Sequence, residues 1–343
     1  MSQDDTLSNS VKKANMSDNA KFTVSDIDKA HKELDLLQKE IDKVIFGQNH
    51  VIEHTLTAIL AGGHTLLVGV PGLAKTRLVN TLGTVLGLDT KRIQFTPDLM
   101  PSDIIGSEIM DSDKSGKRSF RYIQGPIFAQ ILMADEINRA SPRTQSALLQ
   151  AMQEYHVTVA GTHYNLPQPF HVLATQNPLE QEGTYPLPEA QLDRFLMQID
   201  IDYPDLETER RIILETVNQK SQVVKSVLST QKLQKIQKIV RTIPVSENVV
   251  EAILKLVRSA RPYKDNPLAN KYIAWGPGPR ASQALSLCAR ARALYHGRLS
   301  PSLDDVQALA QPVLQHRMAL NFSARAEDIT VKDIIATLVK DAL

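Results

Sequence analysis

The clearest chemical signal in the sequence is a glycine-rich segment, Gly69-Val70-Pro71-Gly72-Leu73-Ala74-Lys75-Thr76. Glycines allow backbone N–H groups to close around a polyphosphate, the lysine can reach the β- and γ-phosphates, and the threonine hydroxyl is a ligand for Mg²⁺. The segment follows a short apolar run and opens a helical pattern, whose N-terminus adds partial positive charge. Ala74 stands where the pattern has glycine, and it is the smallest substitute. These residues predict a nucleotide-binding loop.

Two adjacent carboxylates, Asp135 and Glu136, follow the apolar run Ile131–Ala134. A carboxylate at the end of a buried strand can hold the Mg²⁺ of a nucleotide bound beside it. The glutamate is placed to orient and deprotonate a water for attack on the γ-phosphate. A solvated acidic strand end is the alternative, but together with the glycine-rich loop the pair predicts a hydrolytic site.

A neutral amide, Asn177, follows a third apolar run, Phe170–Thr175. On a strand next to the phosphate loop, this amide could orient the attacking water. Asn-Pro is also a common turn dipeptide, so a turn before Pro178 remains the alternative.

An arginine, Arg194, lies in the segment Leu192–Phe195 at the predicted edge of the nucleotide-binding part. Supplied to a neighbouring subunit's γ-phosphate, an arginine stabilises the charge of the transition state. An internal salt bridge with Asp193 or Glu189 is the alternative.

Further arginines occupy positions that suggest anionic contacts. Arg280 follows Gly276-Pro277-Gly278-Pro279 in the first turn of a predicted helix, where a cation opposes the helix dipole. That placement favours an anionic partner such as a γ-phosphate. Arg139 and Arg143, shortly after the carboxylate pair, are candidates for intersubunit contact.

The elements that must position these residues alternate between strands and helices. The apolar runs Thr65–Val68, Ile131–Ala134 and Phe170–Thr175 are typical of buried parallel strands. Helical periodicity separates them, notably over Thr76–Leu86 and Pro142–Glu154. The alternation predicts an α/β layer with a mostly parallel sheet flanked by helices. A hairpin is expected where His156–Ala160 and Tyr164–Leu166 flank Gly161-Thr162.

The chain divides into three predicted parts. Residues 1–23 are rich in Ser, Asp, Asn and Lys and predict a disordered tail, with a partner-binding tail as the alternative. Residues 24–203 form the α/β domain and begin with a helix capped by Ser25. Residues 204–343 form an all-helical domain after a hinge at Asp202–Asp205. Its expected helices are Leu206–Val217, Leu233–Ile239, Glu247–Ala260, Ala281–Tyr295 and Leu303–Leu309.

The composition is that of a globular protein. The 343 residues include 42% apolar and 22% charged side chains, and the formal net charge is +1, so no global charge favours nucleic acid or an anionic membrane. The single cysteine, Cys288, excludes an internal disulfide and favours a reducing cytoplasm. We expect no membrane span, because no apolar run reaches about 18 residues, and no signal peptide, because residues 1–20 lack an apolar core.

Taken in order, these motifs resemble the AAA+ ATPases, and within them the MoxR family. The resemblance covers residues 25 to 340 and rests on Gly69–Thr76, Phe95–Gly106, Asp135–Ala140, Ala174–Pro178, Leu187–Phe195 and Gly278–Arg280. It implies a P-loop AAA+ module with a C-terminal helical lid, and ATP and Mg²⁺ as ligands. The region Phe95–Gly106 would include the insert in the second helix of the fold, and His156–Leu166 the hairpin before the sensor strand.

The resemblance also implies a role for each candidate residue. Lys75 and Thr76 look like the Walker A pair, Asp135 and Glu136 like Walker B, Asn177 like sensor 1, Arg194 like an arginine finger acting in a neighbour, and Arg280 like sensor 2. Phe46-Gly47-Gln48 is similar to the adenine-side element of the family. Thr76 and Asp135 are the implied metal ligands, and the implied nucleotide-binding set is Gly47, Gln48, Gly69, Val70, Pro71, Gly72, Leu73, Ala74, Lys75, Thr76, Arg77 and Asp135.

At the level of the whole molecule, the resemblance implies a cytoplasmic, ring-forming ATPase, commonly a hexamer. Such proteins act as chaperone-like remodellers of client proteins, often alongside a protein with a von Willebrand factor A domain. A nucleic-acid motor is an alternative, but the hairpin Thr158–Leu166 holds no Lys or Arg. A nucleotide-gated binding module with little turnover and the ATPase component of a metal-chelatase complex are the others.

Overall fold

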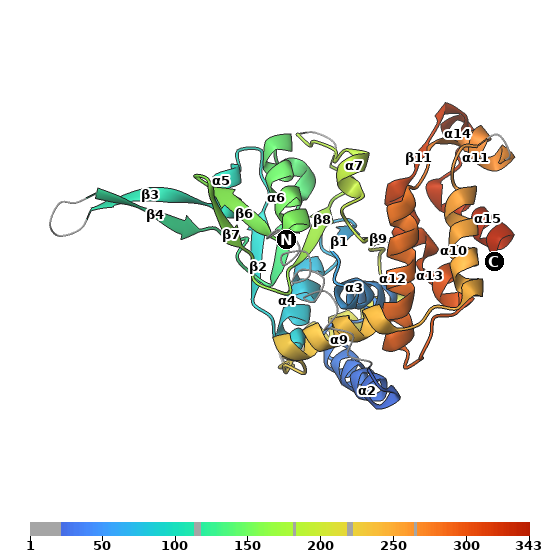
Figure 1. The fold of residues 1–343 in the computed structure, drawn as a ribbon, viewed down its shortest axis with the longest axis horizontal. Helices are drawn as coiled ribbons and strands as arrows, with labels where there is room; N and C mark the ends of the chain where they lie inside the picture. The colour runs from blue at the N-terminus through green and yellow to red at the C-terminus, as the bar shows by residue number, and fades with distance from the viewer. Residues whose placement is uncertain (1–21, 113–117, 181–182, 218–221, 264–265) are drawn as a thin grey trace, which may run out of the picture.

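A computed structural model describes residues 22–112, 118–180, 183–217, 222–263 and 266–343 (Figure 1). The tail expected over residues 1–23 therefore lies almost entirely outside the described residues. None of the helices in the described part of the chain is long and apolar enough to cross a membrane.

A five-stranded parallel sheet forms the centre of the α/β domain. Its strands lie in the order β2-β5-β8-β1-β9, and every neighbouring pair is parallel. The strands are β1 (Thr65–Val68), β2 (Thr90–Gln94), β5 (Ile131–Asp135), β8 (His171–Gln176) and β9 (Met197–Asp200). This order places the ends of β1, β5 and β8, which carry the predicted site residues, at the middle of one sheet edge.

Both faces of the sheet are buried, which explains why its central strands are continuous apolar runs. Leu67 belongs to an apolar core that continues into the C-terminal helices, whereas its neighbour Leu66 belongs to a second core beneath α6. Successive side chains of a strand point to opposite faces, so one short strand supplies both cores. The helices around the sheet are α2 (Val24–Ile41), α3 (Asn49–Leu60), α4 (Lys75–Leu86), α5 (Pro101–Ile105), α6 (Pro142–Glu154) and α7 (Glu189–Leu192), with a 3₁₀ turn over Ile137–Arg139.

The sequence-based expectations for this domain are confirmed with local corrections. The mostly parallel sheet and its three central strands are present, and β2 and β9 are added at its two edges. The first helix is capped by Thr23 rather than Ser25: the Thr23 side chain accepts from the backbone of Asp26, and the Asp26 carboxylate accepts from the backbone of Thr23. This reciprocal capping box satisfies two backbone donors, which a cap at Ser25 would leave exposed.

Two antiparallel hairpins extend from the same side of the domain (Figure 1). The longer pairs β3 (Gly106–Ser112) with β4 (Arg118–Gln124), and the sequence analysis assigned no element to the residues after Gly106. The shorter pairs β6 (His156–Val159) with β7 (Thr162–Asn165), as expected, but it turns at Ala160-Gly161, one residue earlier. Both turn residues have positive φ, as a two-residue hairpin turn requires.

The C-terminal domain is mainly helical, with one correction. Two short strands, β10 (Ile273–Trp275) and β11 (Ala319–Leu320), pair antiparallel within it. The expected helices over 247–260, 281–295 and 303–309 are present, and the last one extends to Leu314. The elements of this domain include α10 (Glu247–Ser259), α11 (Pro267–Tyr272), α12 (Pro279–Tyr295), α13 (Leu303–Leu314), α14 (Phe322–Ala326) and α15 (Val331–Ala342), with a 3₁₀ turn over Gln315–Arg317.

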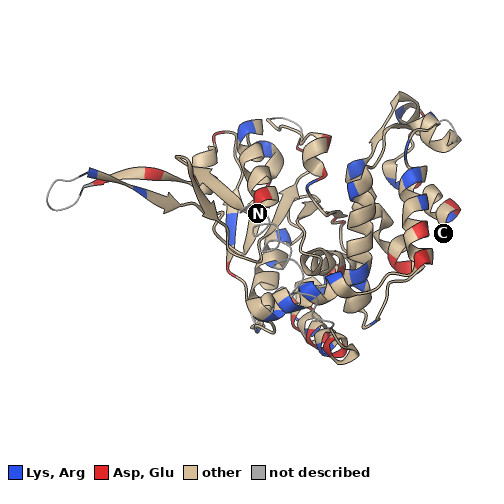
Figure 2. Cartoon of the chain, in the orientation of Figure 1, with Lys and Arg blue, Asp and Glu red and all other residues tan. Residues whose placement is uncertain are grey.

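Helix α9 (Thr230–Thr242) carries a row of basic side chains (Figure 2), and two of them pair with carboxylates of helix α2, which holds both acidic and basic residues. Lys232 forms an ion pair with Glu33 at 2.6 Å, and Lys235 forms one with Asp26 at 2.8 Å. Part of this basic row is therefore engaged within the chain, and α9 joins the N-terminal helix to the rest of the molecule.

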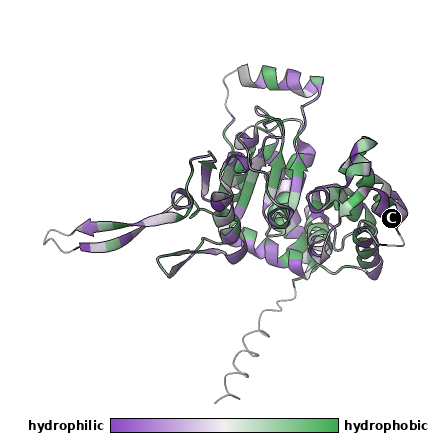
Figure 3. Ribbon diagram, turned by 90° about the horizontal axis from the view of Figure 1, so that it is seen from above, coloured by the Kyte–Doolittle hydropathy of each residue, from purple (hydrophilic) through white to green (hydrophobic). Residues whose placement is uncertain are grey.

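Helix α8 (Leu206–Val217) begins directly after the expected hinge and stands apart from the packed body (Figure 3). Its start is fixed locally, because the Asp205 carboxylate accepts a hydrogen bond of 2.8 Å from the backbone N–H of Thr208. The hydrogen bonds from Thr208 hold the pKa of Asp205 below its ordinary value. Glu207 and Glu209 in the first turn also favour this helix start.

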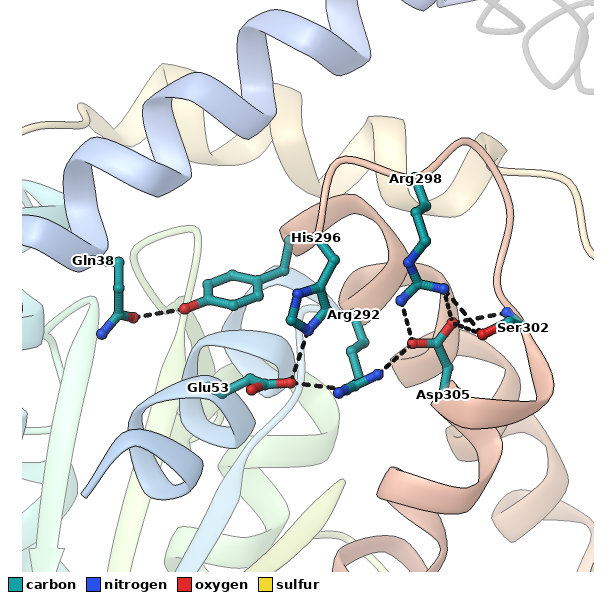
Figure 4. Close-up of polar contacts among 8 residues, drawn as sticks. Gln38, Glu53, Arg292, His296, Arg298, Ser302 and Asp305 are labelled. Carbon is teal, nitrogen blue, oxygen red and sulfur yellow. Dashed lines mark hydrogen bonds and ion pairs between the residues drawn. The ribbon is translucent and has the colours of Figure 1, made fainter. Parts of the chain in front are cut away.

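A chain of polar contacts connects the two domains (Figure 4). Glu53 on α3 accepts from Arg292 of α12 at 2.8 Å, and Arg292 also donates to Asp305 of α13 at 2.7 Å. Arg298 donates to both carboxylate oxygens of Asp305. These contacts fix the orientation of α12 against the α/β domain.

Candidate functional site

The glycine-rich loop runs from the end of β1 into α4, as expected. Gly72 has φ of +87°, and the position where a side chain would begin there has no atom within 4 Å, so the loop leaves open space on that side. Ala74 has φ of +56°, in the left-handed region where glycine is favoured. The loop therefore has the open cradle that a phosphate group requires, although Ala74 adopts a glycine-like conformation to form it.

Lys75 is the first residue of α4, and its ammonium donates to the carbonyl of Gly69 at 2.6 Å. The ammonium thus lies across the loop. Burial lowers the pKa of Lys75, and the negative charges of Asp135, Glu136 and Glu180 oppose that change. Lys75 is therefore close enough to the carboxylates of Asp135 and Glu136 for their charges to interact.

Asp135 ends β5 and is buried, as the sequence suggested. Its Oδ1 accepts from the hydroxyl of Thr175 on β8 at 2.5 Å, and its Oδ2 accepts from Arg92 on β2 at 2.6 Å. The two neighbouring strands therefore hold the carboxylate in a single orientation beside the loop. A carboxylate and a hydroxyl are oxygen ligands of the kind that Mg²⁺ prefers, and the role of Asp135 and Thr76 as metal ligands stays a prediction.

Glu136 follows at the sheet edge, with φ of +56°. Its backbone N–H donates to the Thr175 hydroxyl at 2.9 Å. Its carboxylate accepts from Gln94 at 2.8 Å and from Arg139 at 2.9 Å. A left-handed backbone is strained for a residue with a side chain, so contacts with the surrounding fold must hold Glu136 in this conformation. The chain therefore leaves the direction of β5 at Glu136.

Asn177 lies one residue beyond β8 and is almost fully buried. Its amide oxygen accepts from the backbone N–H of Leu179 at 3.1 Å, which is the turn geometry that the sequence left open as the alternative. Its contact with an attacking water stays a prediction.

Arg194 and Arg280 come together at the boundary between the domains. Both line a cavity of about 360 Å³, which also contains Asp193 and Arg317. Asp193 pairs with the buried Arg317 at 2.7 Å and with Arg280 at 3.4 Å. Within the described ranges neither Asp193 nor Glu189 pairs with Arg194, so the internal salt bridge weighed for Arg194 is not formed.

Arg280 has the anionic partner that its position in the first turn of α12 suggested, and that partner is Asp193. Its NH1 lies 3.4 Å from the Asp193 carboxylate, and its side chain is largely exposed. A contact between Arg280 and a γ-phosphate stays a prediction.

The adenine-side segment lies between the phosphate loop and α8. Gln48 donates to the carbonyl of Leu73 at 3.2 Å, and the guanidinium of Arg211 on α8 lies 4.4 Å from the centre of the Phe46 ring. Gly47 has φ of +68°, and a side chain there would collide with Thr208. The segment is therefore clamped from both sides, and glycine is required at its centre.

Comparison with known proteins places these observations in a family. Residues 64–197 match the ATPase family associated with various cellular activities (AAA), and residues 266–338 match the AAA lid domain. The chain is 42% identical to the chaperone MoxR1 of Mycobacterium tuberculosis over 86% of this chain and 78% of that protein. It is 30% identical to the protein MoxR of Methylorubrum extorquens over 82% of this chain and 86% of that protein. This chain belongs to the MoxR family of AAA+ ATPases.

The structure agrees with this membership. A crystal structure from Cytophaga hutchinsonii, described as that of a candidate ATPase, superposes with a TM-score of 0.85 at 40% identity, over 92% of this chain and 96% of that one. The AAA match spans the glycine-rich loop, the carboxylate pair, Asn177 and Arg194, and the lid match includes Arg280. The MoxR-type fold expected from the sequence, a P-loop AAA+ module with a helical lid, is thereby confirmed.

Four residues of this MoxR-family site were missed by the sequence analysis: Arg92, Gln94, Thr175 and Arg317. Three of them hold the carboxylate pair, and the fourth holds Asp193. Arg92 and Gln94 are on the edge strand β2, where the only buried side chain is that of Ile93. No motif marks them, and only the pairing of β2 with β5 brings them to the site.

Proposed function

We propose that this chain binds ATP at Gly69–Thr76 and hydrolyses it in a Mg²⁺-dependent reaction that drives remodelling of a client protein. The observation that carries the proposal is the grouping of Lys75, Asp135 and Glu136. Lys75 follows the loop after β1, Asp135 and Glu136 stand at the carboxyl end of β5, and the charges of the two carboxylates act on the Lys75 ammonium. Carboxyl ends of parallel strands are where such sheets bind ligands.

In the proposed reaction, Glu136 accepts a proton from a water as the water attacks the γ-phosphate, the bond from the γ-phosphorus to the bridging oxygen breaks, and ADP leaves. Its hydrogen bonds to Gln94 and Arg139 hold the carboxylate at the sheet edge, and Asn177 would orient the water. Mg²⁺, bound through Thr76 and Asp135, would neutralise charge on the β- and γ-phosphates. Lys75 would contact the same phosphates, with backbone N–H groups of the loop and Arg77 at its helical end.

Two arginines complete the proposal. Arg194 would act on the γ-phosphate of a neighbouring copy, so that active sites form between subunits of a ring, with a hexamer as the expected size. Arg280 would act as the sensor of the lid. The name of the M. tuberculosis relative, a chaperone, supports a protein client. On the basis of the resemblance to the family, we also propose a partner protein with a von Willebrand factor A domain. The proposed site of action is the cytoplasm.

ATP turnover per subunit, measured as protein concentration rises, tests this function. The rate should require Mg²⁺, climb with concentration, vanish in Glu136→Gln and collapse in Arg194→Ala. The matched control is Arg325→Ala, which removes an exposed arginine of the lid and should leave the rate unchanged. A folded Glu136→Gln variant with wild-type turnover would refute the role of Glu136, and a rate independent of both concentration and Arg194 would refute the shared site.

A further inference from the structure

Helix α8 stands apart from the packed body (Figure 3), and several of its apolar side chains are exposed. Thr208 and Arg211 face the body, because Thr208 lies against Gly47 and Arg211 lies over the Phe46 ring. With 3.6 residues per turn, Leu206 and Ile213 lie about 20° apart on the helix and point roughly opposite to Thr208. Leu206 is 85% exposed and Ile213 is 61% exposed. A helix packed on its own domain has the reverse pattern.

An exposed apolar stripe on a well-capped helix is typical of a surface that another molecule covers. Glu209 flanks Leu206 on one side of the stripe, and Arg210 and Glu207 flank it on the other, so the surface is apolar at its centre and carries both signs of charge at its rim. The partner that fits it has an apolar groove with charged side chains at the edge.

The chain itself carries such a groove, between helices α10 and α12 of the lid. Val250, Ile253, Leu254 and Leu287 line a hollow of about 350 Å³, with Arg290 at its edge. The Nε of Arg290 is buried and has no hydrogen-bond partner among the described residues.

The groove adjoins the part of the surface that carries Arg194, the arginine proposed to act on a neighbouring copy. Gln283 and Leu287 line both this groove and the cavity that holds Arg194 and Arg280. At the other end of the contact, α8 lies against the adenine-side segment Phe46–Gly47. A copy that brings its Arg194 to the nucleotide site of another copy therefore brings its lid groove toward α8 of that copy.

We propose that the apolar face of α8, centred on Leu206 and Ile213, docks into the groove between α10 and α12 of a second copy of this chain. The contact joins two different surfaces, so it repeats head to tail and can close into a ring. The inference rests on the proposed function, because it takes the direction of approach from the role of Arg194 in a neighbour. It adds the surface that joins the copies.

Site-specific cross-linking of the full chain tests the contact. Ile213→Cys and Leu254→Cys are combined in one chain and treated with a short bismaleimide in the presence of Mg²⁺ and ATP. The native Cys288 does not interfere, since it is buried and burial raises its pKa to about 12. We expect a ladder of covalent oligomers on a denaturing gel. The matched control pairs Ile213→Cys with Phe322→Cys, an exposed lid residue outside the groove, and should give no ladder.

Size-exclusion chromatography of the same samples separates the two ways of failing. Absence of a ladder in a sample that elutes as an oligomer and has concentration-dependent ATPase activity overturns the α8 contact and leaves the proposed function in place. A sample that stays monomeric at every concentration overturns both the contact and the shared active site. An equal ladder in the Phe322→Cys control shows random collision and also overturns the contact.

Mixing two disrupted chains gives an independent check. Ile213→Glu keeps the groove intact, and Leu287→Glu keeps α8 intact, so each variant alone should lose the oligomer. A mixture of the two retains one compatible pair of surfaces and should form dimers but no larger species. Full oligomers from either variant alone would overturn the proposal.

Discussion

At the residue scale, the phosphate-binding loop contains a strained alanine. Ala74 has φ of +56°, and a residue with a Cβ in this region costs roughly 1 kcal/mol relative to glycine. We therefore predict that Ala74→Gly raises the free energy of unfolding by about 1 kcal/mol. Urea denaturation followed by circular dichroism measures this change.

The control is Ala61→Gly at the end of α3, where φ is −72° and alanine is unstrained. The same substitution should lower the stability there, since glycine gains freedom in the unfolded chain. Equal destabilisation at both sites would show that the backbone at Ala74 carries no strain.

The groups that perform chemistry could be predicted from the sequence, but the groups that hold them could not. Lys75, Asp135 and Glu136 are marked by their spacing, because charged residues directly after short buried strands are typical of a phosphate-binding sheet edge. Thr175 and Arg92 hold Asp135 from two different strands. Their role depends on strand order, which the sequence of a single strand does not contain.

At the element scale, the orientation of the lid depends on one buried carboxylate, Asp305 (Figure 4). Burial alone would raise its pKa, but hydrogen bonds from Arg298, Ser302 and Arg292 outweigh burial and hold the pKa below its ordinary value. The carboxylate therefore stabilises the fold in its ionised form. That contribution is complete above about pH 4 and is lost as the pH falls further.

We predict that Asp305→Ala lowers the free energy of unfolding by about 3 kcal/mol, because it leaves the partly buried Arg292 without its partner on α13. Chemical denaturation at pH 7 measures this loss. The neighbouring exposed Asp304→Ala should cost only a few tenths of a kcal/mol, as expected for a charge in the first turn of a helix. Similar losses for the two variants would contradict a specific role for Asp305.

The elements that the sequence did not indicate are those with little buried surface of their own. In β2 only Ile93 is buried, and β9 has four residues, of which Met197 and Ile199 are buried. The hairpin of β3 and β4 exposes apolar side chains such as Phe120 and Met110. Neither the burial nor the alternation that marks a strand is present in it. The pattern of apolar residues identifies strands that are buried at the centre of a sheet, but it does not identify strands at the edges.

At the scale of the whole molecule, the change in periodicity predicts a helical domain after the α/β module, and the family matches confirm that order, whereas the boundary near residue 203 stays a prediction. The relative placement of the two domains could not be predicted, because it depends on the polar contacts of Glu53, Arg292 and Asp305, which come from three separate helices. The α/β domain has buried polar junctions of its own. Two of them are histidines at the start of the sheet, His64 and His171.

These histidines join distant segments as neutral side chains. His64 accepts from the backbone N–H of Val172 at 3.0 Å through Nδ1, so its Nε2 donates to the carbonyl of Met152 at 3.1 Å. His171 donates to the carbonyl of Gly63 at 2.9 Å and accepts from the amide of Gln237 on α9 at 3.1 Å. A second proton on either ring would face a donor, which favours the neutral form.

Protonation of these rings should lower the free energy of unfolding as the pH falls. Burial lowers the pKa of His64 to about 3 and that of His171 to about 4, against an ordinary value near 6.5. Between these limits the unfolded chain binds more protons than the folded chain, so stability is full above about pH 6.5 and falls as the pH decreases. Each histidine contributes a slope of about 1.4 kcal/mol per pH unit near pH 5.

We predict that His64→Asn removes one such contribution. Asparagine can still accept from the backbone N–H of Val172 but cannot titrate, so the variant is less stable at pH 8 and loses stability more slowly below pH 6.5. Urea unfolding at half-unit intervals from pH 8 to pH 4.5 gives the two slopes. Near pH 5 the slope of the variant should be smaller by about 1.4 kcal/mol per pH unit. Parallel curves for the two proteins would mean that His64 takes up its proton in the folded state as readily as in the unfolded chain, and that the sheet tolerates a charge at this junction.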